Sequence, residues 1–207
     1  MSDVAPHGVI DLRGPAGAPA VLLLHPWWGI TPAVMGWADE LVTIGRRVVL
    51  PDLYGGRTAS TIEGAQALQK AMDEDAALRL VERCADELAA DAQPWAAMGF
   101  SMGAFLACHL AGRGTAGPAE LVLFYGGQPP DGDIRTRLVS LHLAPGDEWF
   151  TGEEVTATEE AFRSAGAEVK AYEYPGSGHW FAERDSPGFD ERAAELARSR
   201  VIGQLRP

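Results

Sequence analysis

An apolar run meets a serine set between two glycines in the stretch Pro94-Trp95-Ala96-Ala97-Met98-Gly99-Phe100-Ser101-Met102-Gly103. The run 94–100 is short and apolar, as is typical of a buried parallel strand. Residues 101–112 are rich in small side chains and predict a helix. The motif G-x-S-x-G between them is typical of a sharp strand-to-helix turn that holds a serine hydroxyl outward as a nucleophile. The glycines are required because side chains there would clash where two backbone segments pass closely.

Strands and helices alternate outward from this stretch. Apolar or β-branched runs predict strands at 20–25, 47–51, 94–100, 120–125, 138–143 and 167–174; helical periodicity predicts helices at 32–44, 61–71, 74–90, 101–112, 153–165 and 190–205. This alternation predicts an α/β fold with a mostly parallel central sheet and helices on both faces. No internal repeat or low-complexity linker interrupts it, so we expect residues 1–207 to form a single domain.

Composition narrows the range of partners. The chain has 207 residues, of which 46% are hydrophobic, and a formal net charge of −12. Nucleic acids and anionic membranes attract clustered lysine and arginine, so we expect neither as a partner. The expected partner is a small molecule, and the protein is expected to be a monomer or a small homo-oligomer.

The chain lacks signals for metals, cofactors or export. Cys84 and Cys108 have neither metal-ligand nor disulfide spacing, which favours buried, reduced thiols. The sequence has no HExxH motif and no Walker loop, and no GxGxxG motif follows a predicted strand. We therefore expect no metal and no organic cofactor. The first residues lack a basic segment followed by an apolar one, and the longest apolar stretch, 18–24, is too short to cross a bilayer. A cytoplasmic location is therefore the expectation.

An acid and a base follow later strands. Asp147 comes after the strand 138–143, and His179 comes after the strand 167–174. Loops beyond the carboxyl ends of parallel strands share one crevice, and the order Ser101, Asp147, His179 is that of an α/β-hydrolase triad. Ser101 would attack a carbonyl carbon and His179 would take its proton, because imidazole exchanges protons near neutral pH. Asp147 would hold the imidazole in the required tautomer.

Other residues compete for two of these roles. His25, at the end of the strand 20–25, is the other plausible base, but it precedes the serine. Asp133 and Glu148 are alternative acids. Asp147 is preferred because it directly follows a strand and a turn-forming Pro-Gly pair.

An oxyanion hole and a pocket are expected beside the serine. The backbone N–H of Met102 lies at a helix start, where negative charge is favoured. The second donor should be the N–H of Trp27 in the loop 25–29, because Pro26 has none. Trp28 and Tyr125 are expected to face the substrate pocket. Alternatively, Trp27 and Trp28 could cap the hydrophobic core.

These residues resemble the dienelactone hydrolase family over nearly the whole chain, from about Val21 to the last helix. Three blocks carry the resemblance: His25-Pro26-Trp27-Trp28-Gly29, Pro51-Asp52-Leu53-Tyr54 and Gly178-His179-Trp180-Phe181. It implies a compact α/β-hydrolase without a large lid that cleaves esters or lactones, with carboxymethylenebutenolide as the name-giving substrate. It also places Trp180 at the pocket.

The sequence departs from this family at the site itself. The best-known members have cysteine where this chain has Ser101, and glutamate where it has Pro26. The family also holds a substrate carboxylate with arginines, one of them shortly after the histidine. Glu183 occupies that position here, with Arg184 beside it, and Arg57 is another loop arginine.

Three hypotheses follow. The first is a serine hydrolase that cleaves a small ester or lactone through an acyl-enzyme. The second is a dienelactone hydrolase that has exchanged its nucleophile and uses Arg184 for the carboxylate. The third is a catalytically silent ligand-binding module on the same fold.

Overall fold

The computed structural model describes residues 8–12, 14, 17–91 and 93–207. Within these ranges, seven strands form one sheet in the order β1-β3-β2-β4-β5-β6-β7. The strands are β1 (Val9–Leu12), β2 (Ala20–Leu24), β3 (Arg47–Pro51), β4 (Ala96–Phe100), β5 (Glu120–Phe124), β6 (Leu138–Leu143) and β7 (Glu168–Glu173). The pairs from β3 to β7 are parallel, and β1 runs antiparallel to β3. The mostly parallel sheet is confirmed.

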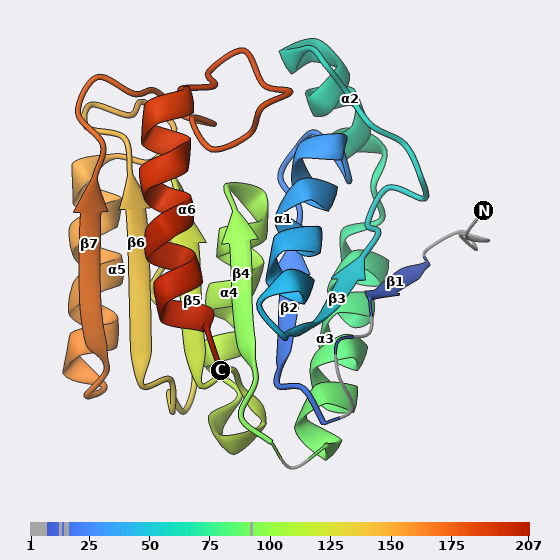
Figure 1. Ribbon diagram of the computed structural model, residues 1–207, viewed down its shortest axis with the longest axis vertical. Helices are drawn as coiled ribbons and strands as arrows, with labels where there is room; N and C mark the ends of the chain where they lie inside the picture. Colours follow the sequence, from blue (N-terminus) through green and yellow to red (C-terminus); the bar gives the residue numbers. More distant parts are fainter. Residues whose placement is uncertain (1–7, 13, 15–16, 92) are drawn as a thin grey trace.

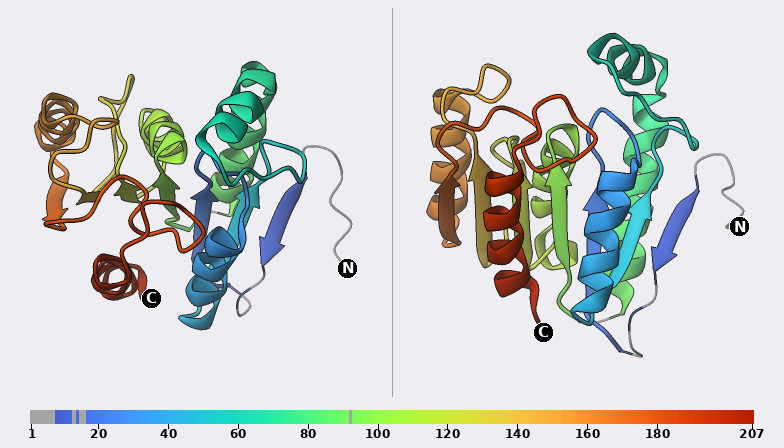
Figure 2. Two further views of the ribbon diagram at one scale, coloured as in Figure 1. Left: turned by 90° about the horizontal axis from the view of Figure 1, so that it is seen from above. Right: turned by 45° about the horizontal axis from the view of Figure 1, so that its top comes forward.

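Helices cover both faces of the sheet (Figure 1). They are α1 (Pro32–Thr43), α2 (Ile62–Ala71), α3 (Glu74–Ala90), α4 (Met102–Ala111), α5 (Gly152–Ser164) and α6 (Glu191–Leu205), with a short 3-10 turn at Gly114–Ala116. Helices α1 and α6 lie on one face, and α3, α4 and α5 lie on the other, as the view from above in Figure 2 shows. The six helices match the predicted ones to within a residue or two at each end.

The core has two layers, one on each side of the sheet. All five residues of β2 and all five of β4 are buried, because both of their faces are covered by helices. The edge strand β1 was not predicted. It has only four residues, none of them buried, so its apolar pattern is too weak to read from sequence.

The strand order places a crevice at the carboxyl ends of β2 and β4. After β2 the chain passes through α1 to β3 on one side, and β4 then returns to the other side of β2. Helices α1 and α4 therefore leave the sheet on opposite faces (Figure 2). Loops that diverge in this way leave room for a ligand between them. The loop 25–29 and Ser101 both lie at this point.

None of the helices in the described residues combines the length and the apolar character needed to cross a membrane.

Candidate active site

Ser101 lies in a strained turn between β4 and α4. Its φ is 48°, a left-handed value that few non-glycine residues adopt. A Cβ at Gly99 would lie 2.2 Å from the Gly103 oxygen, and a Cβ at Gly103 would lie 2.2 Å from the Leu24 oxygen. The Ser101 N–H donates to the Phe124 oxygen at 2.9 Å, which extends the β4–β5 pairing into the turn. Glycine on both sides therefore lets the serine turn sit directly against β2.

The structure brings Ser101, His179 and Asp147 into one hydrogen-bonded chain. The Ser101 Oγ lies 3.0 Å from His179 Nε2. The other ring nitrogen of His179, Nδ1, lies 2.6 Å from Asp147 Oδ2. The His179 and Asp147 side chains are only 5% and 3% exposed. Burial strengthens the hydrogen bond between them. This hydrogen bond orients the imidazole toward the serine.

Local backbone structure holds the carboxylate in place. A turn closes with the Asp147 N–H donating to the Ala144 oxygen at 3.2 Å, and Gly146 supplies the positive φ of 78°. The second carboxylate oxygen, Oδ1, accepts the Trp149 N–H at 2.8 Å. Both oxygens of Asp147 thus have donors, so its orientation is determined from two sides.

The competing acids lie elsewhere. Glu148 is exposed to solvent. Asp133 pairs through its backbone with Arg113 after the C-terminal end of α4, and its side chain accepts a hydrogen bond from Arg135 at 2.9 Å. Neither carboxylate lies within hydrogen-bond distance of His179.

His25 is a structural residue. It is fully buried; its Nδ1 donates to the Pro26 oxygen at 2.8 Å and its Nε2 accepts the Leu53 N–H at 3.2 Å. Burial is the main cause that lowers its pKa, which keeps the ring neutral. Its ring also contacts that of Tyr54, with 5.1 Å between centroids. The two hydrogen bonds of His25 therefore connect the loop that carries Trp27 to the loop after β3.

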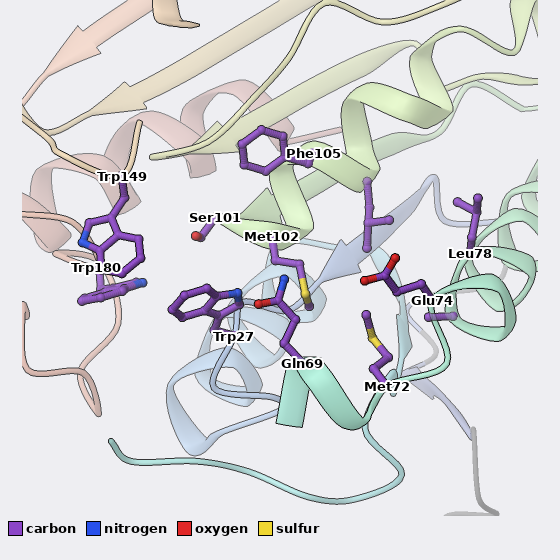
Figure 3. Close-up of a pocket in the computed structure, with 12 residues that line it drawn as sticks. Trp27, Gln69, Met72, Glu74, Leu78, Ser101, Met102, Phe105, Trp149 and Trp180 are labelled. Carbon is purple, nitrogen blue, oxygen red and sulfur yellow. The ribbon is translucent and has the colours of Figure 1, made fainter. Parts of the chain in front are cut away.

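The two predicted oxyanion donors lie beside the serine. Met102 is the first residue of α4, so its N–H has no acceptor within the helix. Trp27 lies in a turn closed by the Gly29 N–H and the Pro26 oxygen at 3.1 Å. Both residues line the same cavity as Ser101 (Figure 3). Their role in binding an oxyanion stays a prediction.

A cavity of about 440 Å³ opens beside Ser101. Its walls come from the loops after β2 and β6, from helices α2, α3 and α4, and from the loop that carries His179. The lining residues are Trp27, Gln69, Met72, Glu74, Ala77, Leu78, Ser101, Met102, Phe105, Leu106, Trp149 and Trp180. Figure 3 shows Trp149 and Trp180 on one side of Ser101, and Glu74 and Leu78 at the far end.

Among the four predicted pocket residues, Trp180 lines this cavity, and the other three lie outside it. Trp28 is buried, and its ring packs edge-on against Trp180 with 5.1 Å between centroids. Tyr125 is buried behind His179. Arg184 is exposed, with its guanidinium 5.9 Å from the Phe189 ring. These three side chains do not line the cavity, because adjacency to a site in sequence does not determine which way a side chain turns.

A buried carboxyl group lies behind the histidine. The Tyr125 hydroxyl donates to Glu183 Oε1 at 2.5 Å, and the Tyr125 ring lies 4.9 Å from the His179 ring. Glu183 is 1% exposed, and its other oxygen has no partner among the described residues. Burial raises the pKa of Glu183 to about 8, and it raises the pKa of Tyr125 well above its ordinary value. Both groups therefore carry a proton near neutral pH.

Sequence reasoning missed most of the cavity wall. Phe105 and Leu106 lie three and four residues after Met102, the spacing that puts residues on one face of a helix. That signal was available from the sequence. The contributions of α2 and α3 to the cavity wall could not be read from the sequence, because nothing in their amphipathic patterns indicates that they lie against the serine turn.

Cys84 and Cys108 are buried, as expected, and burial raises their pKa values to about 11 and about 12. Their thiols are therefore protonated and unreactive at neutral pH. In the described ranges, no three His, Cys, Asp or Glu side chains come together as metal ligands.

Comparisons with known proteins show the family of the chain. The family model described as "Dienelactone hydrolase family" matches residues 10–207. Carboxymethylenebutenolidase 1 of Cupriavidus pinatubonensis is 30% identical over 91% of this chain and 86% of its own length. A dienelactone hydrolase-like promiscuous phosphotriesterase from metagenomic libraries superposes with a TM-score of 0.73 at 21% identity, covering 94% of this chain and 87% of the other. A phospholipase/carboxylesterase from Dyadobacter fermentans superposes at 0.64 and 18% identity, covering 98% and 99%. The chain belongs to the dienelactone hydrolase family of α/β-hydrolases.

Proposed function

We propose that this protein hydrolyses carboxylic esters or lactones through an acyl intermediate on Ser101. The observation that carries the proposal is the hydrogen-bonded chain from Ser101 Oγ to His179 Nε2 at 3.0 Å, and from His179 Nδ1 to Asp147 Oδ2 at 2.6 Å. A serine hydroxyl is a weak nucleophile until a base accepts its proton, and this arrangement supplies the base together with a group that orients it.

The proposed reaction has two halves. Ser101 Oγ attacks the carbonyl carbon as its proton passes to His179 Nε2, and Asp147 stabilises the resulting imidazolium. The N–H groups of Trp27 and Met102 would hold the oxyanion. His179 returns the proton to the leaving alcohol oxygen as the C–O bond breaks, which leaves an ester on Ser101. Water then attacks that ester with His179 again as base, releasing the acid and restoring the hydroxyl.

The test is hydrolysis of short-chain p-nitrophenyl esters by the wild type and by Ser101→Ala. We expect kcat/KM to fall by at least about 10³-fold in the variant, because the nucleophile, its activation and the covalent route are lost together. Ser140→Ala, a buried serine of β6 outside the cavity, is the matched control and should keep wild-type activity.

A fluorophosphonate probe gives an independent readout. Mass spectrometry should locate the adduct on Ser101 in the wild type and find none in Ser101→Ala. Equal hydrolysis by the two proteins, or labelling at another residue, would contradict the proposal. Absence of both hydrolysis and labelling would favour the silent binding module.

A further inference from the structure

The cavity beside Ser101 is walled mainly by apolar side chains. Among its twelve described lining residues, nine are apolar or aromatic: Trp27, Met72, Ala77, Leu78, Met102, Phe105, Leu106, Trp149 and Trp180. The three tryptophans lie near the serine, with ring centroids 5.3 Å apart for Trp27 and Trp149 and 5.6 Å apart for Trp149 and Trp180. Figure 3 shows the cavity running from these rings, past Met102, to Leu78 and Glu74. Its shape and lining suit an extended apolar group.

The charged group in the cavity wall is a carboxylate that is also exposed to solvent. Glu74 is the one charged side chain among the described lining residues, and Figure 3 shows its carboxylate directed toward the cavity from α3. The arginines considered from sequence contribute no positive charge to this wall. Arg57 donates to the Tyr54 oxygen at 2.9 Å, and Arg184 packs over Phe189 at the surface.

The position where the resemblance implies an arginine supplies no positive charge either. Glu183 occupies it, turned away from the cavity, and is buried against the Tyr125 hydroxyl. No cation therefore faces the cavity from the His179 loop, and a carboxylate entering the cavity would lose water without gaining a partner.

We propose that the cavity holds an uncharged, apolar arm of the substrate, either its acyl chain or its alkoxy chain, and that it discriminates against a carboxylate on that arm. This inference rests on the proposed function and names its substrate class. Apolar walls favour each methylene that they cover, whereas Glu74 repels a negative charge at the far end. Discrimination of this kind separates the protein from enzymes that select carboxylated lactones.

The first experiment varies chain length. kcat/KM is measured for p-nitrophenyl acetate, butyrate and hexanoate, and for the matching alkyl acetates. In one of the two series we expect a rise of up to about fourfold per methylene covered. Leu78→Trp fills the far end of the cavity and should erase the gain of hexanoate over acetate, or of hexyl acetate over its shortest homologue.

Leu196→Trp is the matched control, since Leu196 is 46% exposed on α6 and does not line the cavity. It should keep the wild-type chain-length profile. A flat profile in both series, or the same profile in Leu78→Trp as in the wild type, would overturn the proposal.

The second experiment varies charge at constant length. Where the acyl series shows the gain, wild-type kcat/KM for p-nitrophenyl hydrogen adipate should be at least about tenfold below that for p-nitrophenyl hexanoate, since the two differ mainly in a terminal carboxylate that the cavity leaves unpaired. Where the alkyl series shows the gain, 6-acetoxyhexanoate and hexyl acetate take the places of adipate and hexanoate throughout. Glu74→Lys replaces repulsion by attraction and should raise the ratio of the adipate rate to the hexanoate rate by up to about fivefold.

Asp75→Lys is the matched control because it makes the same change in net charge in the same first turn of α3, without lining the cavity. It should change the adipate rate by less than about twofold. A wild-type preference for adipate, or equal effects of the two lysines, would overturn the substrate assignment while Ser101-dependent hydrolysis persists. Absence of hydrolysis for every ester and of any adduct at Ser101 would instead defeat the proposed function itself.

Discussion

At the residue scale, backbone strain gathers at the candidate site. Ser101, Tyr125 and Trp180 are the non-glycine residues with positive φ in the described parts of the chain. Ser101 and Tyr125 directly follow β4 and β5, and Trp180 follows His179. Each such conformation costs about 1–3 kcal/mol and persists only where packing enforces it. The concentration of strain supports the assignment of function to this edge of the sheet.

Glu183 makes stability depend on pH in a defined direction. The folded protein keeps the Glu183 proton up to about pH 8, whereas the ordinary value of the carboxyl pKa is 4.5. Between these values the folded state binds more protons than the unfolded chain, so the free energy of unfolding falls as pH rises, by at most about 1.4 kcal/mol per pH unit. Below about pH 4.5 Glu183 is protonated in both the folded and the unfolded state, so it adds no pH dependence to the free energy of unfolding.

Glu183→Gln tests this prediction. The amide oxygen still accepts the Tyr125 hydroxyl, but nothing titrates, so the variant should lose this part of the slope and be more stable than the wild type at the alkaline end. The measurement is urea unfolding at several pH values across the window. Glu160→Gln, an exposed carboxylate of α5, should follow the wild type. Parallel curves for the wild type and Glu183→Gln would show that Glu183 does not hold its proton.

At the element scale, the contact between α4 and β2 depends on glycine. A methyl group at Gly103 would lie 2.2 Å from the Leu24 backbone oxygen, and backbone in a central strand cannot move aside easily. Gly103→Ala should therefore lower the free energy of unfolding by about 3 kcal/mol or more, or prevent soluble expression. The urea midpoint and the soluble yield measure the effect.

Gly36→Ala is the matched control within another helix. Gly36 is exposed in α1, and a Cβ there meets nothing within 4 Å. Alanine should raise the free energy of unfolding by about 1 kcal/mol, because it favours the helix without a steric cost. Similar losses at the two positions would show that the close approach of α4 to β2 is not what requires Gly103.

At the scale of the whole molecule, stability should decrease from the centre of the sheet to its edges. Strands β2 and β4 are buried throughout and paired on both sides, whereas no residue of β1 or β7 at the edges is buried. Amides of β2 and β4 should thus exchange with deuterium most slowly, near the rate set by global unfolding. Hydrogen exchange followed by mass spectrometry provides the measurement. Equal or greater protection of β1 and β7 would contradict this order.

The sequence by itself determined the parallel sheet, the serine turn and the order of its partners. These features depend on local chemistry: continuous apolar strands, glycines where backbone segments approach, and polar residues directly after strands. Such signals can be read from the sequence alone. The hydrogen-bonded chain of Ser101, His179 and Asp147 could therefore be predicted.

Only the tertiary structure decided which side chains face the cavity. Trp28, Tyr125 and Arg184 turn away from it, while Gln69, Glu74 and Leu78 reach it from helices distant in sequence. The physical reason is that the direction of a side chain depends on how elements pack, and packing is set by contacts between segments that no local pattern contains. The acidic, apolar character of the cavity, and with it the proposed substrate class, therefore became visible only in three dimensions.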